Sequence, residues 1–112
     1  MTDENDPPSP DYLGHRDRLR SRFLESGPGA LADYEMLELL LFQAIPRRDT
    51  KPVAKALIDR FGSYAAVLRA DVDALQRVKG IGPSGAVMLR AVADAAERLA
   101  RQEIIDKPVL SS

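Results

Sequence analysis

The residues best suited to chemistry in this chain lie in one short segment, 78–86, where glycines and a proline follow a lysine. Gly80 and Gly82 flank Ile81, and glycine allows a positive φ or a close backbone approach that a side chain would block. Pro83 favours the first turn of a helix, because its missing N–H would have no partner there. We therefore expect a tight hairpin whose backbone N–H groups lie at the positive end of the next helix, where a phosphate oxygen can bind.

The hairpin is expected to expose the N–H groups of Gly82, Ser84 and Gly85, with Lys79 as its only basic side chain. Ile81 is expected to point back and hold the turn against both flanking helices. A plainer interpretation is a glycine-rich helix end joined to a helix start. The segment nevertheless follows a fuller pattern: Leu75-x-x-Val78-x-Gly80-Ile81-Gly82-x-x-x-Ala86-x-x-Leu89.

This pattern resembles the helix-hairpin-helix motif, which binds nucleic-acid backbones without reading the base sequence. The resemblance implies that the hairpin contacts DNA phosphates through Lys79, Gly80, Ile81, Gly82, Ser84 and Gly85. Many such motifs carry Lys or Arg where this chain has Gly85, so one phosphate-binding charge is missing here.

A second candidate loop covers residues 45–51 and contains Arg47, Arg48 and Lys51 beside a predicted helix start. It has no glycine, so it cannot form the same tight turn. If the two hairpins lie side by side, Lys79 and these three basic side chains form one DNA-binding edge. The alternative is a solvated loop in which Arg47 pairs with nearby acids, and the residue types leave both interpretations open.

Composition limits the remaining possibilities. The chain has 112 residues, the length of one small domain, with 16 Lys and Arg against 17 Asp and Glu. It has no Cys and a single His, which excludes disulfides, thiolate ligands and a His-pair zinc site. No apolar run approaches the roughly 18 residues of a membrane helix, and the acidic N-terminus does not resemble a secretory signal. We therefore predict a cytoplasmic-type domain with no membrane contact, no cofactor and no enzymatic centre.

Hydrophobic periodicity predicts an all-α fold, a compact bundle of about five to six helices with no period-two strand pattern. It would hold one clear and one degenerate helix-hairpin-helix motif, as in SAM-like tandem-hairpin folds. Residues 1–12 are expected to be a disordered acidic arm, 13–103 the helical domain and 104–112 a linker. The helices are expected at 14–25, from 33 to the break before Pro46, from about 50 to 61, at 64–69, from about 72 to 78 and at 83–103.

Capping residues mark several of these boundaries. Asp33, Ser63 and Asp71 are expected N-caps, Asp49 or Thr50 is expected to cap the third helix, and Gly62 is expected to end it. In the last helix the apolar stripe of Met88, Val92, Ala95 and Leu99 is expected to face the core, with its many alanines allowing close helix packing.

The first helix carries four arginines on two edges, Arg16 with Arg20 and Arg18 with Arg22, on either side of an apolar stripe. One interpretation is that these side chains pair with acids of the next helix. The other is that they face phosphates, and the residue types are compatible with both.

Several further blocks follow in order along the chain. They are Gly14-His15-Arg16-x-Arg18-Leu19-Arg20-x-Arg22-Phe23, Asp33-Tyr34-Glu35-x-Leu37-Glu38-Leu39-Leu40-Leu41, Ala44-Ile45-Pro46-Arg47-Arg48-Asp49-x-Lys51-Pro52, and Arg60-Phe61-Gly62-Ser63, before the glycine hairpin. Together they resemble the N-terminal domain of the RadC family, whose members are labelled DNA repair or UPF0758 proteins. The resemblance covers about residues 14–112.

In that family a JAMM/MPN-type zinc metalloprotease-like domain follows this one, and its signature contains two histidines. Because the chain has only His15, the resemblance implies an accessory domain without its catalytic partner, and residues 108–112 resemble the junction. Two functions follow as expectations. One is weak, backbone-directed DNA binding; the other is protein interaction, with the JAMM/MPN domain or another partner. An enzymatic role for this chain is the weakest expectation, since no nucleophile has a suitable base beside it.

Overall fold

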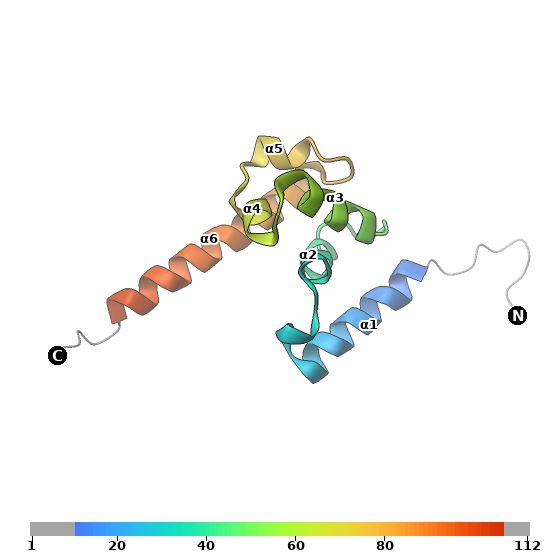
Figure 1. Ribbon diagram of the computed structural model, residues 1–112, viewed down its shortest axis with the longest axis horizontal. Helices are drawn as coiled ribbons and strands as arrows, with labels where there is room; N and C mark the ends of the chain where they lie inside the picture. The colour runs from blue at the N-terminus through green and yellow to red at the C-terminus, as the bar shows by residue number, and fades with distance from the viewer. Residues whose placement is uncertain (1–10, 107–112) are drawn as a thin grey trace, which may run out of the picture.

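The protein, seen in a computed structural model, is described over residues 11–106, where every regular element is a helix (Figure 1). No strand occurs among these residues, so the predicted all-α fold is confirmed. Six α-helices and one short 3₁₀ helix follow in order: α1 (Asp11–Ser26), η1 (Pro28–Ala30), α2 (Asp33–Leu41), α3 (Lys51–Phe61), α4 (Tyr64–Arg69), α5 (Val72–Gln76) and α6 (Gly82–Asp106).

Local capping explains several helix boundaries. Ser63 Oγ accepts the Ala66 N–H at the start of α4, and an Asp71 carboxylate oxygen accepts the Ala74 N–H at the start of α5. Gly62 ends α3 with a φ of 100°, in the left-handed region that favours glycine. These three predicted caps are therefore confirmed.

One other capping prediction, at α2, is wrong, and the prediction of Asp49 or Thr50 at α3 is confirmed by a division between the two residues. Ala32, not Asp33, occupies the N-cap of α2, and its N–H is accepted by the carboxylate of Glu35 at 2.9 Å. Thr50 occupies the N-cap of α3 but makes no capping bond with its side chain. Asp49 instead accepts the N–H of Lys51 at 3.1 Å, so it supplies the side-chain contact at this helix start.

Three element ends differ from the predicted ones. α2 stops at Leu41, before the predicted break, and residues 42–44 form a turn. α1 begins at Asp11, so two residues assigned to the acidic arm are helical, and α6 continues through residues 104–106 of the predicted linker. The rest of the arm and of the linker, 1–10 and 107–112, lies outside the described residues.

The main core lies between α2, α3, α4, α5 and the first half of α6, which together form a compact globule. Its members are mostly aliphatic side chains: Leu37, Leu41, Val53, Ala54, Leu57, Val67, Leu75, Val78, Ile81, Ala86 and Leu89. The residues on both sides of the glycine hairpin belong to this core, so the hairpin is fixed to the body of the domain.

A second, smaller apolar cluster attaches α1 to the other side of α2. Leu19, Leu31 and Phe42 are buried in it, with Phe23 packed against them. An ion pair between Arg22 and Glu35, at 2.7 Å, closes the edge of this contact.

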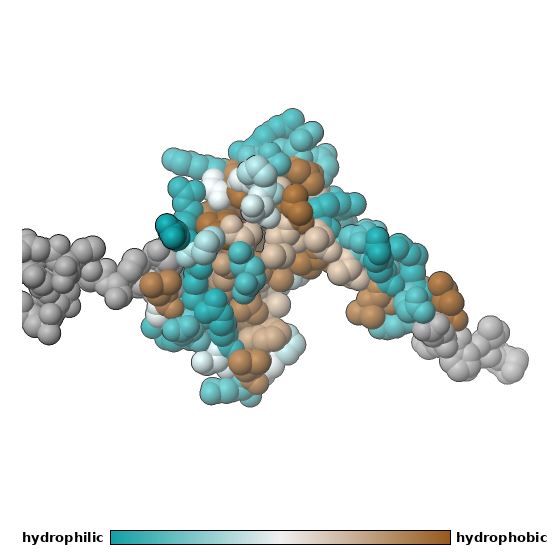
Figure 2. All heavy atoms as spheres, turned by 180° about the vertical axis from the view of Figure 1, so that it is seen from behind, coloured by the Kyte–Doolittle hydropathy of each residue, from teal (hydrophilic) through white to brown (hydrophobic). Residues whose placement is uncertain are grey.

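The second half of α6 projects away from the globule (Figure 1). Met88 and Val92 are half-buried, whereas Ala95 and Leu99 are exposed, so the far half of the predicted stripe does not face the core. No described element lies alongside this stretch, and periodicity cannot reveal whether an apolar face has a partner. Apolar surface is visible near its far end (Figure 2), where Ile104 and Ile105 are each 74% exposed.

Candidate nucleic-acid interface

The glycine hairpin joins α5 to α6 through a tight turn. The N–H of Ile81 donates to the carbonyl of Val78 at 3.2 Å, and both side chains are buried. Gly80 and Gly82 have φ values of 97° and 61°, as their positions in the pattern predict. Ile81 is only 2% exposed and points into the core, so its part is to anchor the turn.

The outer side of the turn is accessible. Lys79, Gly82 and Ser84 are exposed, and a Cβ built on Gly82 would meet no atom within 4 Å. Gly85 differs from the expectation, because it is buried against Ile81: a Cβ there would lie 3.4 Å from an Ile81 methyl group. Gly85 thus allows close packing of α6, and an exposed N–H at this position is not found.

The second candidate loop, residues 45–51, is called the basic loop below and lies directly beside this turn. A Cβ on Gly80 would lie 2.8 Å from Arg48 Nη1 and 2.9 Å from Val53 Cγ2, distances that real Cβ atoms do not show. Glycine is therefore required at this position for packing as well as for its φ value. The pairing of the two loops, which the residue types left open, is present in the fold.

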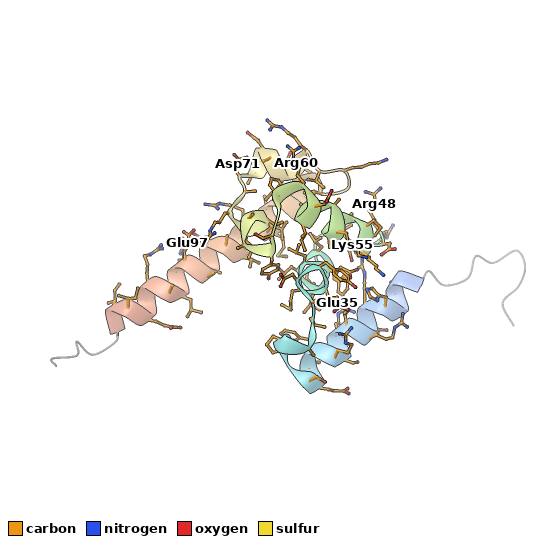
Figure 3. The ribbon with its side chains drawn as sticks, viewed as in Figure 1. Glu35, Arg48, Lys55, Arg60, Asp71 and Glu97 are labelled. Atoms are coloured by element: carbon orange, nitrogen blue, oxygen red, sulfur yellow. The ribbon has the colours of Figure 1, made fainter. Side chains whose placement is uncertain are left out.

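A cavity of about 450 Å³ opens where the two loops meet. Its walls come from the basic loop, the first two turns of α3 and the hairpin: Arg48, Asp49, Pro52, Val53, Ala56 and Lys79. Arg48 projects beside α3 on this side of the globule (Figure 3). Arg47 and Lys51 are exposed on the same loop but do not line the cavity, so the fold brings Arg48 and Lys79 together more closely than the other two.

Arg16 of α1 holds the basic loop in place. Its guanidinium is buried and donates to four backbone carbonyl oxygens. They belong to Phe42, which follows α2 directly, and to Ile45, Pro46 and Arg48 of the basic loop. The bond to the Arg48 carbonyl measures 2.7 Å, and the guanidinium also lies 4.8 Å from the centre of the Phe42 ring. Charge-assisted bonds of this kind are the stronger class of hydrogen bond in proteins. The carbonyl of Phe42, the first residue after α2, is among those satisfied from α1.

Sequence reasoning missed this function of Arg16 and placed it on an edge of α1. A usable signal existed: Arg16 precedes Leu19 by three positions and Phe23 by seven, so it lies on the apolar stripe itself. An arginine within an apolar stripe has to find buried acceptors.

The other arginines of α1 favour the packing interpretation. Arg22 pairs with Glu35, and Arg20 lies 3.3 Å from Asp17 of the same helix. The hydrogen bond from Arg22 holds the pKa of Glu35 below its ordinary value, against the opposing effect of burial. Arg18 is exposed.

Glu38 is a second functional position that the sequence did not reveal. Its side chain is fully buried, accepts the Thr50 hydroxyl at 3.2 Å and lies 3.1 Å from His15 Nε2. It therefore connects α1, α2 and the start of α3 at one point. The consequence for the interface is that α3 begins at a fixed position beside the hairpin.

Residues 11–106 contain neither a membrane-spanning helix nor a metal centre. No helix there is long and apolar enough to cross a membrane. No group of three His, Asp or Glu residues there is arranged to hold a metal ion. The chemistry concentrated at this surface is positive charge beside free backbone N–H groups.

The model of one protein family, described as UPF0758 N-terminal, matches residues 12–87. That range includes α1, both loops and the first turns of α6. No solved structure matches the chain significantly.

Proposed function

Because the chain belongs to the UPF0758 N-terminal family, the N-terminal domain of RadC proteins, we propose that it binds DNA backbones without reading base sequence. The unit of α5, turn and α6 acts as a helix-hairpin-helix, and the basic loop before α3 is its degenerate partner. Phosphates contact the backbone N–H groups of Gly82 and Ser84 and the side chains of Lys79 and Arg48.

The observation that carries this proposal is the meeting of Arg48 and Lys79 beside the glycine hairpin. The two cations come from loops 31 positions apart, yet both line one cavity, and the Arg48 guanidinium lies close to Gly80. Helix N-termini attract anions through unpaired N–H groups and the helix dipole. Asp49 is the one carboxylate among the cavity-lining residues, and it accepts the Lys51 N–H.

Binding is expected to be weak, since few phosphates are reached and the chain carries a formal charge of −1. With about two to four phosphate contacts, the slope of log K against log salt is about −2 to −3.5. Fluorescence anisotropy with a labelled 20-base-pair duplex at low salt measures both quantities. An absence of binding at tens of micromolar protein would contradict the proposal.

A charge-matched pair of variants makes the test specific. The double variant Arg48→Ala/Lys79→Ala is expected to abolish most binding and to flatten the salt slope by about two, near one for each phosphate-binding cation removed. The control, Arg69→Ala/Arg101→Ala, removes the same charge from exposed positions outside the cavity and is expected to retain binding. Equal losses in both double variants would show that overall charge alone attracts DNA.

One observation favours a second function, protein docking through the far half of α6. Leu99, Ile104 and Ile105 are 61–74% exposed there, and at about 100° per residue they lie on different sides of the helix, so each offers a separate apolar contact. The candidate partner is the JAMM/MPN-type domain expected in RadC proteins. Calorimetric titration of that domain into this chain tests the idea, and Leu99→Glu should weaken the association while leaving DNA binding unchanged.

A further inference from the structure

The cavity between the two loops contains more than a contact to duplex phosphates requires. Phosphates on the outside of a duplex can be bound by cations on an open surface. Here the two cations lie at a hollow of about 450 Å³, within the size range of small-ligand sites. The hollow is open to solvent and has room for a ligand group larger than a phosphate.

The walls of the cavity differ in chemistry from one side to the other. Arg48 and Lys79 provide two positive charges beside the single carboxylate of Asp49, whereas Pro52, Val53 and Ala56 provide an apolar surface along the first turns of α3. A ligand that joins an anion to a flat or ring-shaped apolar group matches this arrangement of a charged wall and an apolar wall. One nucleotide has that composition, with a phosphate at one end and a sugar and base at the other.

The cavity is preformed in the fold. Val53 is buried and touches the hairpin at Gly80, and the Arg48 backbone is fixed by its bond to Arg16. A ligand that enters such a site loses little binding free energy to rearrangement of the protein.

A paired and stacked nucleotide cannot place its sugar and base in a hollow of the protein, but an unpaired one can. We propose that the cavity holds one unpaired nucleotide of a DNA strand, so that gapped or overhanging DNA binds more tightly than a blunt duplex. This inference rests on the proposed DNA-binding function and adds the class of DNA. The phosphate lies against Arg48 and Lys79, and the sugar and base lie on the wall of Pro52 and Ala56.

The test compares three DNAs that share one labelled strand, at one salt concentration: a blunt duplex, a duplex with a single-stranded overhang of three nucleotides, and a duplex with a one-nucleotide gap. The DNA with the overhang and the DNA with the gap are each expected to bind about tenfold more tightly than the blunt duplex, a difference of about 1.4 kcal/mol in binding free energy. Ala56→Leu fills the cavity from an exposed helical position and should remove this preference while leaving blunt-duplex affinity within about twofold. Ala65→Leu makes the same change at an exposed position of α4 outside the cavity and should preserve the preference.

The outcomes separate the two proposals. If no DNA binds, the proposed function itself fails. If all three DNAs bind equally, or if Ala56→Leu weakens them all equally, DNA binding stands and the nucleotide site is wrong. Thymidine 5′-monophosphate, titrated alone and followed by amide chemical shifts, distinguishes the source: tight binding of the free nucleotide without a preference among the DNAs would also overturn the inference.

Discussion

Arg16 and Arg48 are 32 positions apart, yet the guanidinium of Arg16 donates a 2.7 Å hydrogen bond to the backbone carbonyl of Arg48. One arginine thus fixes the backbone from which the other extends its side chain toward the hairpin. α1 contributes no residue to the cavity, but it sets the conformation of the loop that does.

Arg16→Met should destabilise the domain strongly, because four backbone carbonyls lose a charged donor. Hydrogen bonds to charged groups contribute about 1.5–3 kcal/mol each, so a loss of about 3 kcal/mol or more is expected in urea unfolding. Amide hydrogen exchange should accelerate in residues 43–50. Arg18→Met, at an exposed position of the same helix, is the matched control and should change little.

The same variant also separates positioning from simple stabilisation. If Arg16 acts on DNA through Arg48, the binding losses of Arg16→Met and Arg48→Ala should be smaller in combination than their sum. The measurement is made at a temperature where every variant is folded. Additive losses would show that Arg16 does not act through Arg48.

Gly80→Ala should be costly for two reasons: a φ of 97° and a Cβ that would press on Val53. The left-handed conformation alone costs a non-glycine residue about 1–2 kcal/mol. Thermal unfolding of this variant can be compared with that of Gly29→Ala, whose Cβ meets no atom within 4 Å and whose φ is not positive. A similar melting temperature for both variants would contradict the close approach of the two loops.

Glu38→Ala should cost about 1–3 kcal/mol in urea unfolding, since the buried Thr50 hydroxyl loses its acceptor. The effect should extend to DNA binding, because α3 begins next to Thr50. Glu103→Ala, at an exposed position of α6, serves as the control. An unchanged stability in Glu38→Ala would show that this buried contact contributes nothing.

The ion pair of Arg22 and Glu35 predicts a dependence of stability on acid. Because the folded state lowers the pKa of Glu35, its contribution is complete above the unfolded value of about 4.3 and is lost as pH falls through the folded value. Glu35→Gln should therefore be less stable than the wild type at pH 7, and the difference should shrink below about pH 4. Glu97→Gln, at an exposed position, should show a much smaller change with pH than Glu35→Gln. A difference that grows on acidification would contradict the assignment.

Much of the fold follows from local sequence. The caps at Ser63 and Asp71 and the left-handed Gly62 each depend on a few neighbouring residues, so the pattern predicts them. The hairpin is also local, because two glycines at fixed spacing adopt the positive φ values that the turn needs. A local contact was nevertheless misread at α2, where Ala32, three positions before Glu35, is the N-cap in place of Asp33.

The functions of Arg16 and Glu38 were missed because their partners lie far away along the chain. The partners of Arg16 lie 26–32 positions away, and Glu38 reaches 23 positions back to His15. No local pattern identifies such partners, so the hydrogen bonds that hold the basic loop against α1 could not be predicted from the sequence. Gly85 was misassigned although its nearest contact is local: Ile81, four positions earlier, packs against it, and Ile45 of the other loop lies slightly farther away.

The uninterrupted course of α6 has a geometric consequence for anything joined to its far end. From Gly82 to Asp106 the helix has 25 residues, which at 1.5 Å each span about 37 Å, and no glycine or proline interrupts it after Gly85. The number of residues in α6 thus sets both the distance of an attached body from the hairpin and its rotation about the helix axis. Deleting one residue from the projecting half would rotate an attached body by about 100° around the helix axis while moving it only about 1.5 Å closer to the hairpin.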